Sequence, residues 1–145
     1  LDHRRLFTGD TFGLSYRDFD VDGRAFILPT TTPVHFDPEA LVASVDRLLA
    51  YRPKAIYLTH YGEITEVERL GRELKQRVAA FVRLARDLQH ATDRGARMRE
   101  EMFRMLCGWL DEHGYRGDAA ARRELLDGDV ELNVQGLEHW LDRAA

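Results

Sequence analysis

The chain has 145 residues, 44% hydrophobic and 32% charged, which is enough for one globular domain with a buried core. Its net charge of −4 argues against a nucleic-acid partner, because proteins that bind nucleic acids usually present a basic surface. No apolar run approaches the roughly 18 residues of a membrane-spanning helix, and no signal-peptide pattern occurs, so we expect no membrane partner. The one cysteine, Cys107, excludes an intrachain disulfide and fits a cytoplasmic location.

The first part of the chain has the pattern of an α/β layer. Residues 5–8 predict a strand, residues 37–51 a helix, and residues 54–59 a second, continuously apolar strand that we expect to be buried on both faces. Between the first strand and the helix, residues 11–36 are mostly irregular, with a turn at residues 20–23 that contains a favourable Asp-Gly pair. Strand, helix and strand in this order indicate packing of helices on a sheet.

The second part predicts helices alone. Apolar residues at helical spacing predict four of them, at residues 65–90, 97–113, 118–126 and 131–143. A capping box opens the first helix, and Asp127-Gly128 is expected to separate the last two. We expect the arginine-rich face of the first helix to be solvated, with binding of an anionic carrier as the alternative. We expect the Met and Trp side chains within residues 98–110 and 134–141 to lie either in contacts between helices or on the surface of a homo-oligomer.

Two potential metal ligands follow the two strands. Asp10 and His60 stand where the strands end, and α/β folds place their chemistry at strand ends beside loops. A carboxylate and an imidazole at one sheet edge would suit zinc, iron or manganese, although catalytic zinc normally has three protein ligands. Each residue also has a simpler explanation, because Asp10 could be a turn residue or helix cap and His60 a hydrogen-bonded structural residue.

These motifs carry a resemblance to a known family. L-F-T-G-D-T-F-G at residues 6–13, followed by Y-L-T-H-Y-G at residues 57–62, resembles the C-terminal half of a metallo-β-lactamase-fold hydrolase. The resemblance implies an α/β fold, namely the C-terminal half of an αββα sandwich at residues 1–62 and an all-helical extension at residues 63–145. By the same resemblance, Asp10 bridges two metal ions and His60 is a ligand of the second.

The resemblance also implies an activity. Two divalent metal ions, zinc or alternatively iron or manganese, would activate a hydroxide that attacks an ester, thioester, lactone or related bond of a small-molecule substrate. No catalytic residue is expected beyond the metal ligands. Because residues 11–36 leave directly from Asp10, we expect them to line the pocket, with Tyr16, Arg17 and His35 as substrate contacts.

The sequence departs from the family in one large respect. The family's H-x-H-x-D-H motif and a further ligand histidine before the G-D strand are missing. The first expected strand also lies close to Leu1, so we expect a C-terminal fragment of a longer protein, inactive alone and holding metal weakly or not at all. The alternative is a non-catalytic module, in which helices on a degenerate hydrolase half associate with a partner through the helices or the sheet edge.

Overall fold

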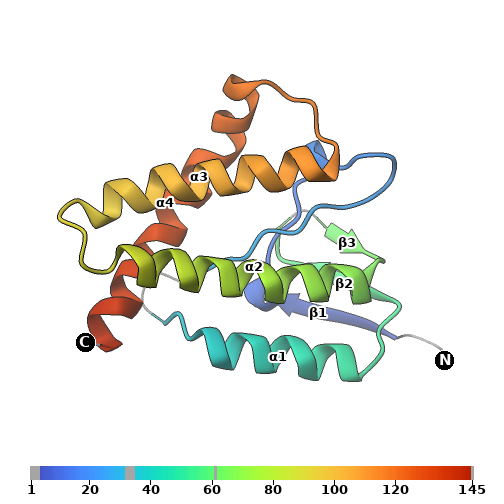
Figure 1. Cartoon of the computed structure of the whole chain (residues 1–145). Helices are drawn as coiled ribbons and strands as arrows, with labels where there is room; N and C mark the ends of the chain where they lie inside the picture. The colour runs from blue at the N-terminus through green and yellow to red at the C-terminus, as the bar shows by residue number, and fades with distance from the viewer. Residues whose placement is uncertain (1–3, 32–34, 61, 145) are drawn as a thin grey trace. The chain divides into compact units, whose positions relative to one another are not determined.

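The computed structural model describes residues 4–31, 35–60 and 62–144, so Tyr61 of the second motif lies outside the described residues. The described residues form a mixed α/β structure (Figure 1). Its elements in chain order are β1 (Arg5–Gly9), the short 3₁₀ helices η1 (Asp10–Phe12) and η2 (Arg17–Phe19), α1 (Pro38–Ala50), β2 (Ala55–Leu58), β3 (Gly62–Ile64), α2 (Val67–Leu88), α3 (Arg94–His113) and α4 (Ala119–Ala144).

Contacts between residues divide the chain into two compact units. The first, which we call the sheet unit, comprises Leu1–Thr30 and Pro38–Val78, and the second, the helical unit, comprises Thr31–Asp37 and Ala79–Ala145. The division falls inside α2, which contributes residues to both units. The expected division into a metallo-β-lactamase-like part at residues 1–62 and a helical extension at residues 63–145 stays a prediction.

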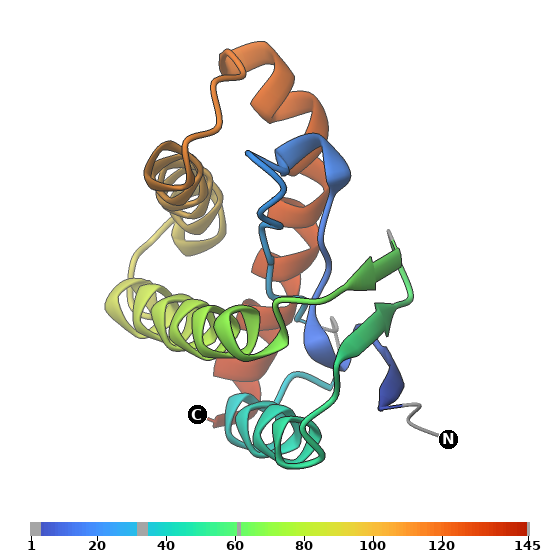
Figure 2. The ribbon, with the colours of Figure 1, turned by 90° about the vertical axis from the view of Figure 1, so that its right-hand side faces the viewer.

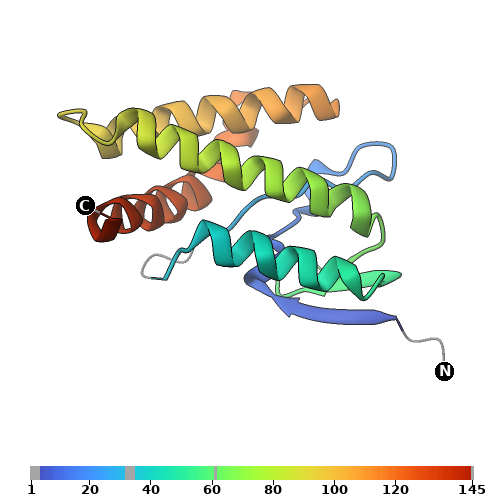
Figure 3. The ribbon, with the colours of Figure 1, turned by 60° about the horizontal axis from the view of Figure 1, so that its bottom comes forward.

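The sheet unit contains a three-stranded sheet in the order β1-β2-β3, with β1 parallel and β3 antiparallel to β2. Helix α1 and the first half of α2 lie on the same side of this sheet (Figures 2 and 3). Ile56 and Ile64 are paired in register and buried. In the next row of the sheet, Phe7 of β1 is 83% exposed and stacks on Tyr57 of β2, with ring centroids 4.9 Å apart.

The expected burial of the second strand on both faces is therefore wrong for this chain. Ala55, Ile56 and Leu58 are buried, but Tyr57 is only half-buried. The physical reason is that helices cover one face of the sheet, whereas no described element of the sheet unit covers the other (Figure 2). An apolar strand thus has a covering layer on one side only.

Several local predictions for the sheet unit are confirmed. Both strands and the helix between them form close to the expected residues. The helix ends before Arg52, whose φ of 48° breaks the helical backbone directly ahead of Pro53. The turn at residues 20–23 also forms, because Val21 and Arg24 exchange backbone hydrogen bonds of 3.1 and 2.9 Å. Asp22 and Gly23 both have positive φ, as a type I′ turn requires.

The helical unit pairs α3 with α4 in antiparallel fashion. Arg94 at the start of α3 forms an ion pair of 2.6 Å with Asp142 near the end of α4. Asp111 near the end of α3 forms one of 2.6 Å with Arg122 near the start of α4. Gly114 adopts the left-handed conformation (φ 96°) and ends α3 as predicted. No helix among the described residues is both long and apolar enough to cross a membrane.

The two helices predicted at residues 118–126 and 131–143 are one continuous helix, α4. Asp118 caps it as expected, since its Oδ1 accepts a hydrogen bond of 2.9 Å from the Ala121 amide. Gly128 does not break the helix, because a glycine in a helix costs only about 1 kcal/mol. Burial of Leu126, Val130 and Val134 along one stripe outweighs that cost.

Candidate metal centre

Asp10 is held between two glycines of the G-D-T-F-G motif. Gly9 (φ 56°) ends β1, and Gly13 (φ 74°) ends η1. A Cβ atom on Gly13 would lie 2.3 Å from the carbonyl oxygen of Leu28, so only glycine fits there. The carbonyl oxygen of Asp10 accepts hydrogen bonds from the Gly13 amide (2.9 Å) and the Thr30 hydroxyl (3.1 Å). The backbone of Asp10 is thus fixed, while its side chain remains 51% exposed.

His60 stands in the turn that follows β2. Because β1 and β2 are parallel, their carboxyl ends meet at the same edge of the sheet. The Nε2 atom of His60 lies 3.7 Å from Oδ1 of Asp10, and the His60 side chain is 56% exposed. The structure therefore brings the two predicted ligands together at the surface of the sheet unit.

The spacing of the two side chains fits a pair of ligands to one cation. At 3.7 Å, the Asp10 and His60 atoms are too far apart for a good hydrogen bond. Two ligands of a tetrahedral zinc ion, with bonds of about 2.0–2.1 Å, are separated by roughly 3.4 Å. Within the part of the chain that the structure describes, no three His, Cys, Asp or Glu side chains are grouped so that they could hold a metal ion. Asp10 and His60 therefore bring one carboxylate and one imidazole together, without a third such side chain among the described residues.

The three residues expected to contact a substrate do not all lie in the same unit. Arg17, in η2, donates a hydrogen bond to the carbonyl oxygen of Glu63 in β3 and forms a 3.4 Å ion pair with Asp20. Tyr16 packs edge-on against Phe19, with ring centroids 5.8 Å apart. Both belong to the sheet unit, together with Asp10 and His60. His35 is exposed and belongs to the helical unit. Their roles in binding a substrate stay predictions.

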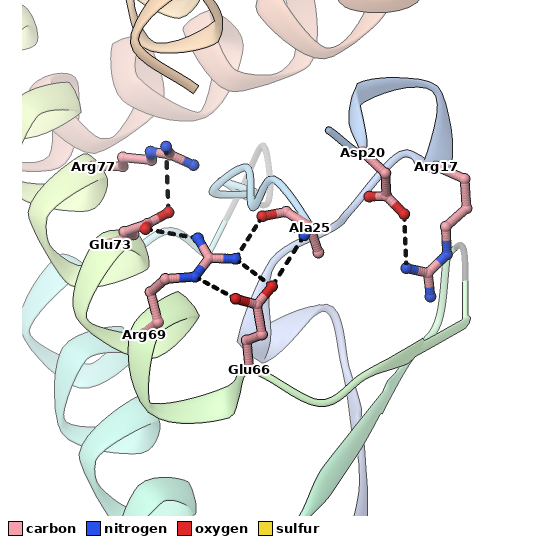
Figure 4. Close-up of polar contacts among 7 residues, drawn as sticks. All are labelled: Arg17, Asp20, Ala25, Glu66, Arg69, Glu73 and Arg77. Carbon is pink, nitrogen blue, oxygen red and sulfur yellow. Dashed lines mark hydrogen bonds and ion pairs between the residues drawn. The ribbon is translucent and has the colours of Figure 1, made fainter. Parts of the chain in front are cut away.

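Sequence reasoning missed a polar cluster that holds the irregular segment to α2. Glu66 accepts a hydrogen bond of 3.1 Å from the Ala25 amide, and Arg69 donates one of 2.9 Å to the Ala25 carbonyl oxygen (Figure 4). The two side chains pair with each other at 2.6 Å. The hydrogen bond from Arg69 lowers the pKa of the Glu66 carboxyl group, against the opposing effect of burial. Donating this hydrogen bond to Glu66 raises the pKa of Arg69.

Arg77 extends this cluster by one further turn of α2. Its guanidinium group pairs with Glu73 at 3.5 Å (Figure 4). The same group donates to the carbonyl oxygen of Ile27 and lies 4.1 Å from the centroid of the Phe26 ring. The expectation of a solvated arginine face is therefore wrong for Arg69, whereas Arg72, Arg83 and Arg86 of that face are exposed as predicted. The charges of Arg69 and Arg77 are balanced by Glu66 and Glu73, so these two arginines are poorly suited to an anionic carrier.

Comparisons with protein-family models, with curated proteins and with solved structures found no match to this chain. The likeness of its two motifs to those of a hydrolase family therefore stays an expectation. A functional assignment depends on the placement of Asp10 and His60 and on the uncovered face of the sheet.

Proposed function

We propose that this chain is the C-terminal portion of a metallo-β-lactamase-fold hydrolase that acts on an ester, thioester, lactone or related bond of a small molecule. The observation that carries the proposal is the meeting of Asp10 and His60. They follow neighbouring parallel strands and place a carboxylate oxygen and an imidazole nitrogen 3.7 Å apart. These are the positions at which the two motifs of the resembled family supply metal ligands.

The residues present fit two of the ligands of such a centre. Asp10 has two carboxylate oxygens, which could bridge two ions, and η1 fixes its backbone. His60 would bind through a neutral imidazole, the common ligand for zinc, with iron and manganese as alternatives. A metal pair would supply a hydroxide of lowered pKa and a Lewis acid for the carbonyl oxygen. In this chain the task of Asp10 and His60 is to hold and orient that pair.

The uncovered face of the sheet supports the idea of an incomplete sandwich. Phe7 and Tyr57 form an aromatic pair on that face, and Phe7 is 83% exposed. Aromatic side chains of this size usually contribute to a core, since burying one stabilises a protein by about 1.5–3 kcal/mol. A second sheet packed on this face would bury the pair and could bring the further ligands that a catalytic centre needs. Alone, the chain would then be inactive.

Metal binding by the 145-residue chain is the first test. Co²⁺ is titrated into the protein while the histidine side-chain resonances are followed by NMR. We expect weak binding that perturbs His60 before the other five histidines and is abolished by Asp10→Asn. Asp87→Asn, which changes an exposed carboxylate on α2, is the matched control and should leave the titration unchanged. Perturbation of other histidines with His60 unaffected would refute the metal half-site of Asp10 and His60.

Hydrolysis is the second test, and it requires a longer protein that supplies the remaining ligands. With ester, thioester and lactone substrates, we expect Asp10→Asn and His60→Ala each to lower kcat/KM by at least 100-fold, because ligand loss disturbs the metal pair. Asp87→Asn again serves as the control. An Asp10→Asn protein with unchanged activity and unchanged metal content would contradict the proposal.

A non-catalytic interaction module is the second candidate. The observation that favours it is the edge position of β1 among the described strands, together with the exposed Phe7 on the sheet face that no described element of the sheet unit covers. Association through this surface would bury apolar area without any metal. Under this proposal, Phe7→Ser abolishes association in light-scattering measurements, whereas Asp10→Asn changes neither association nor any activity.

A further inference from the structure

Arg17 connects the irregular segment to the strand that follows His60. The segment leaves Asp10 and reaches Arg17 in η2. There the guanidinium group donates to the carbonyl oxygen of Glu63 in β3 and lies 3.4 Å from Asp20. The contact therefore joins backbone that leaves the first ligand position to backbone that follows the second.

The turn that carries His60 is closed at its base. Leu58 of β2 pairs in register with Gly62 of β3, and Tyr57 pairs with Glu63. The Tyr57 hydroxyl donates a further hydrogen bond of 3.0 Å to the Glu63 carboxylate. Gly62 has a φ of 90°, and a Cβ atom built on it would lie 3.7 Å from Nη2 of Arg17. The guanidinium group thus lies against Gly62 and Glu63, which pair with the last residues of β2 before the turn that contains His60.

Arg69 fastens the same segment at a different place. It binds the carbonyl oxygen of Ala25 from α2 and pairs with Glu66 and Glu73 (Figure 4). Both arginines hold the segment through backbone carbonyl groups. Arg17 donates a hydrogen bond to β3, whereas Arg69 donates hydrogen bonds to Glu66, Glu73 and Ala25. Loss of Arg69 would therefore weaken only the attachment of the segment to α2, whereas loss of Arg17 would release the segment from β3.

We infer that Arg17 is a positioning residue that holds the turn carrying His60 in register with Asp10. The inference deepens the proposed function, since the positioned pair is the proposed half-site. The contacts that carry the inference join protein atoms alone, so its test needs no metal. It also gives the guanidinium group a task within the protein besides the substrate contact predicted from sequence.

The test compares Arg17→Ala with Arg69→Ala in the 145-residue chain. NMR measures the nuclear Overhauser effect between the Asp10 and His60 side chains and the hydrogen exchange of the Gly62 and Glu63 amides. We expect Arg17→Ala to abolish the Overhauser effect and to speed exchange at these amides at least tenfold. Arg69→Ala should lower overall stability but keep the Overhauser effect. Should Arg17→Ala fail to fold, Arg17→Gln replaces it, because its shorter side chain carries no charge.

Each result decides the inference. An Overhauser effect that survives the loss of the guanidinium group, or one that Arg69→Ala weakens as much as Arg17→Ala does, would overturn it. The metal proposal is judged separately by the Co²⁺ titration of the unmodified chain. If His60 does not respond to Co²⁺ there but the Overhauser effect depends on Arg17, the metal half-site fails and the positioning role of Arg17 stands.

Discussion

The sheet unit and the helical unit differ in how they cover their apolar side chains. In the helical unit, α3 and α4 bury side chains such as Met102, Leu106 and Leu137 almost completely. In the sheet unit, helices cover one face of the sheet, and the opposite face leaves Phe7 83% exposed. A pair of antiparallel helices can bury its apolar stripes against each other, whereas a sheet with apolar residues on both faces needs a layer on each side.

Arginines bind backbone carbonyl groups in both units. In the helical unit, Arg94 and Arg99 of α3 pair with carboxylates of α4, and Arg122 donates to the carbonyl oxygens of Cys107, Tyr115 and Gly117 around the connection between the two helices. In the sheet unit, Arg17, Arg69 and Arg77 donate to backbone carbonyl groups. Helices satisfy their own backbone groups, but an irregular segment must find partners for them elsewhere. In the sheet unit these contacts hold the irregular segment that leaves Asp10, so a single substitution there can move a residue of the candidate site.

The largest loss of stability should come from a substitution in the buried core of the helical unit. Leu137→Ala removes a fully buried side chain from α4 and should lower the free energy of unfolding by about 2–5 kcal/mol. Phe7→Ala removes a mostly exposed ring and should cost less than about 1 kcal/mol. Urea denaturation followed by circular dichroism measures both. Equal costs would show that the Phe7 face is covered in solution.

The next effect concerns the glycine beside the candidate site. Gly13→Ala places a Cβ atom against the Leu28 carbonyl oxygen at a positive φ and should cost about 1–3 kcal/mol. Gly23→Ala is the control, because Gly23 has a similar φ of 75° but open space around it. The difference between the two free energies of unfolding isolates the contact. If Gly23→Ala lowers the free energy of unfolding as much as Gly13→Ala does, the positive φ alone explains why residue 13 is a glycine.

A stabilising substitution tests the continuity of α4. Gly128 lies inside the helix with open space around it, so Gly128→Ala should raise the free energy of unfolding by up to about 1 kcal/mol. Thermal denaturation of the variant measures the gain. A loss of stability would instead mean that the helix is interrupted at Asp127-Gly128, as the sequence pattern alone suggested.

The smallest effect is a pH dependence in the helical unit. Hydrogen bonds from Arg99, and then from Gln135, lower the pKa of Glu131 to about 2. A lowered pKa in the folded state stabilises the protein above the unfolded value near 4.5, and this contribution is lost as the pH falls towards 2. Because the pair is exposed to solvent, we expect less than about 1 kcal/mol.

Glu131→Gln tests this pH dependence in urea titrations at pH 6 and pH 3. The variant should lose less stability than the unmodified chain between these values. An identical loss in both proteins would assign the acid sensitivity to other carboxylates.

Sequence patterns predicted most elements of this protein. The helix opened by Pro38, the turn at Asp22-Gly23 and the end of α3 at Gly114 all depend on the preferences of neighbouring residues, which can be recognised without the fold. The approach of Asp10 to His60 was also predictable, because strand ends of a parallel pair meet at one edge of the sheet.

Tertiary structure alone decided three features. Whether Gly128 breaks a helix depended on the burial of its neighbours along α4, and whether Arg69 faces solvent depended on a backbone segment distant in sequence. The apolar run around Tyr57 predicted two covered faces, but coverage depends on which layers are present. Local patterns thus determined where helices, strands and turns form. Contacts between residues far apart in the chain decided which side chains they bury, because burial energy depends on the partner as much as on the residue.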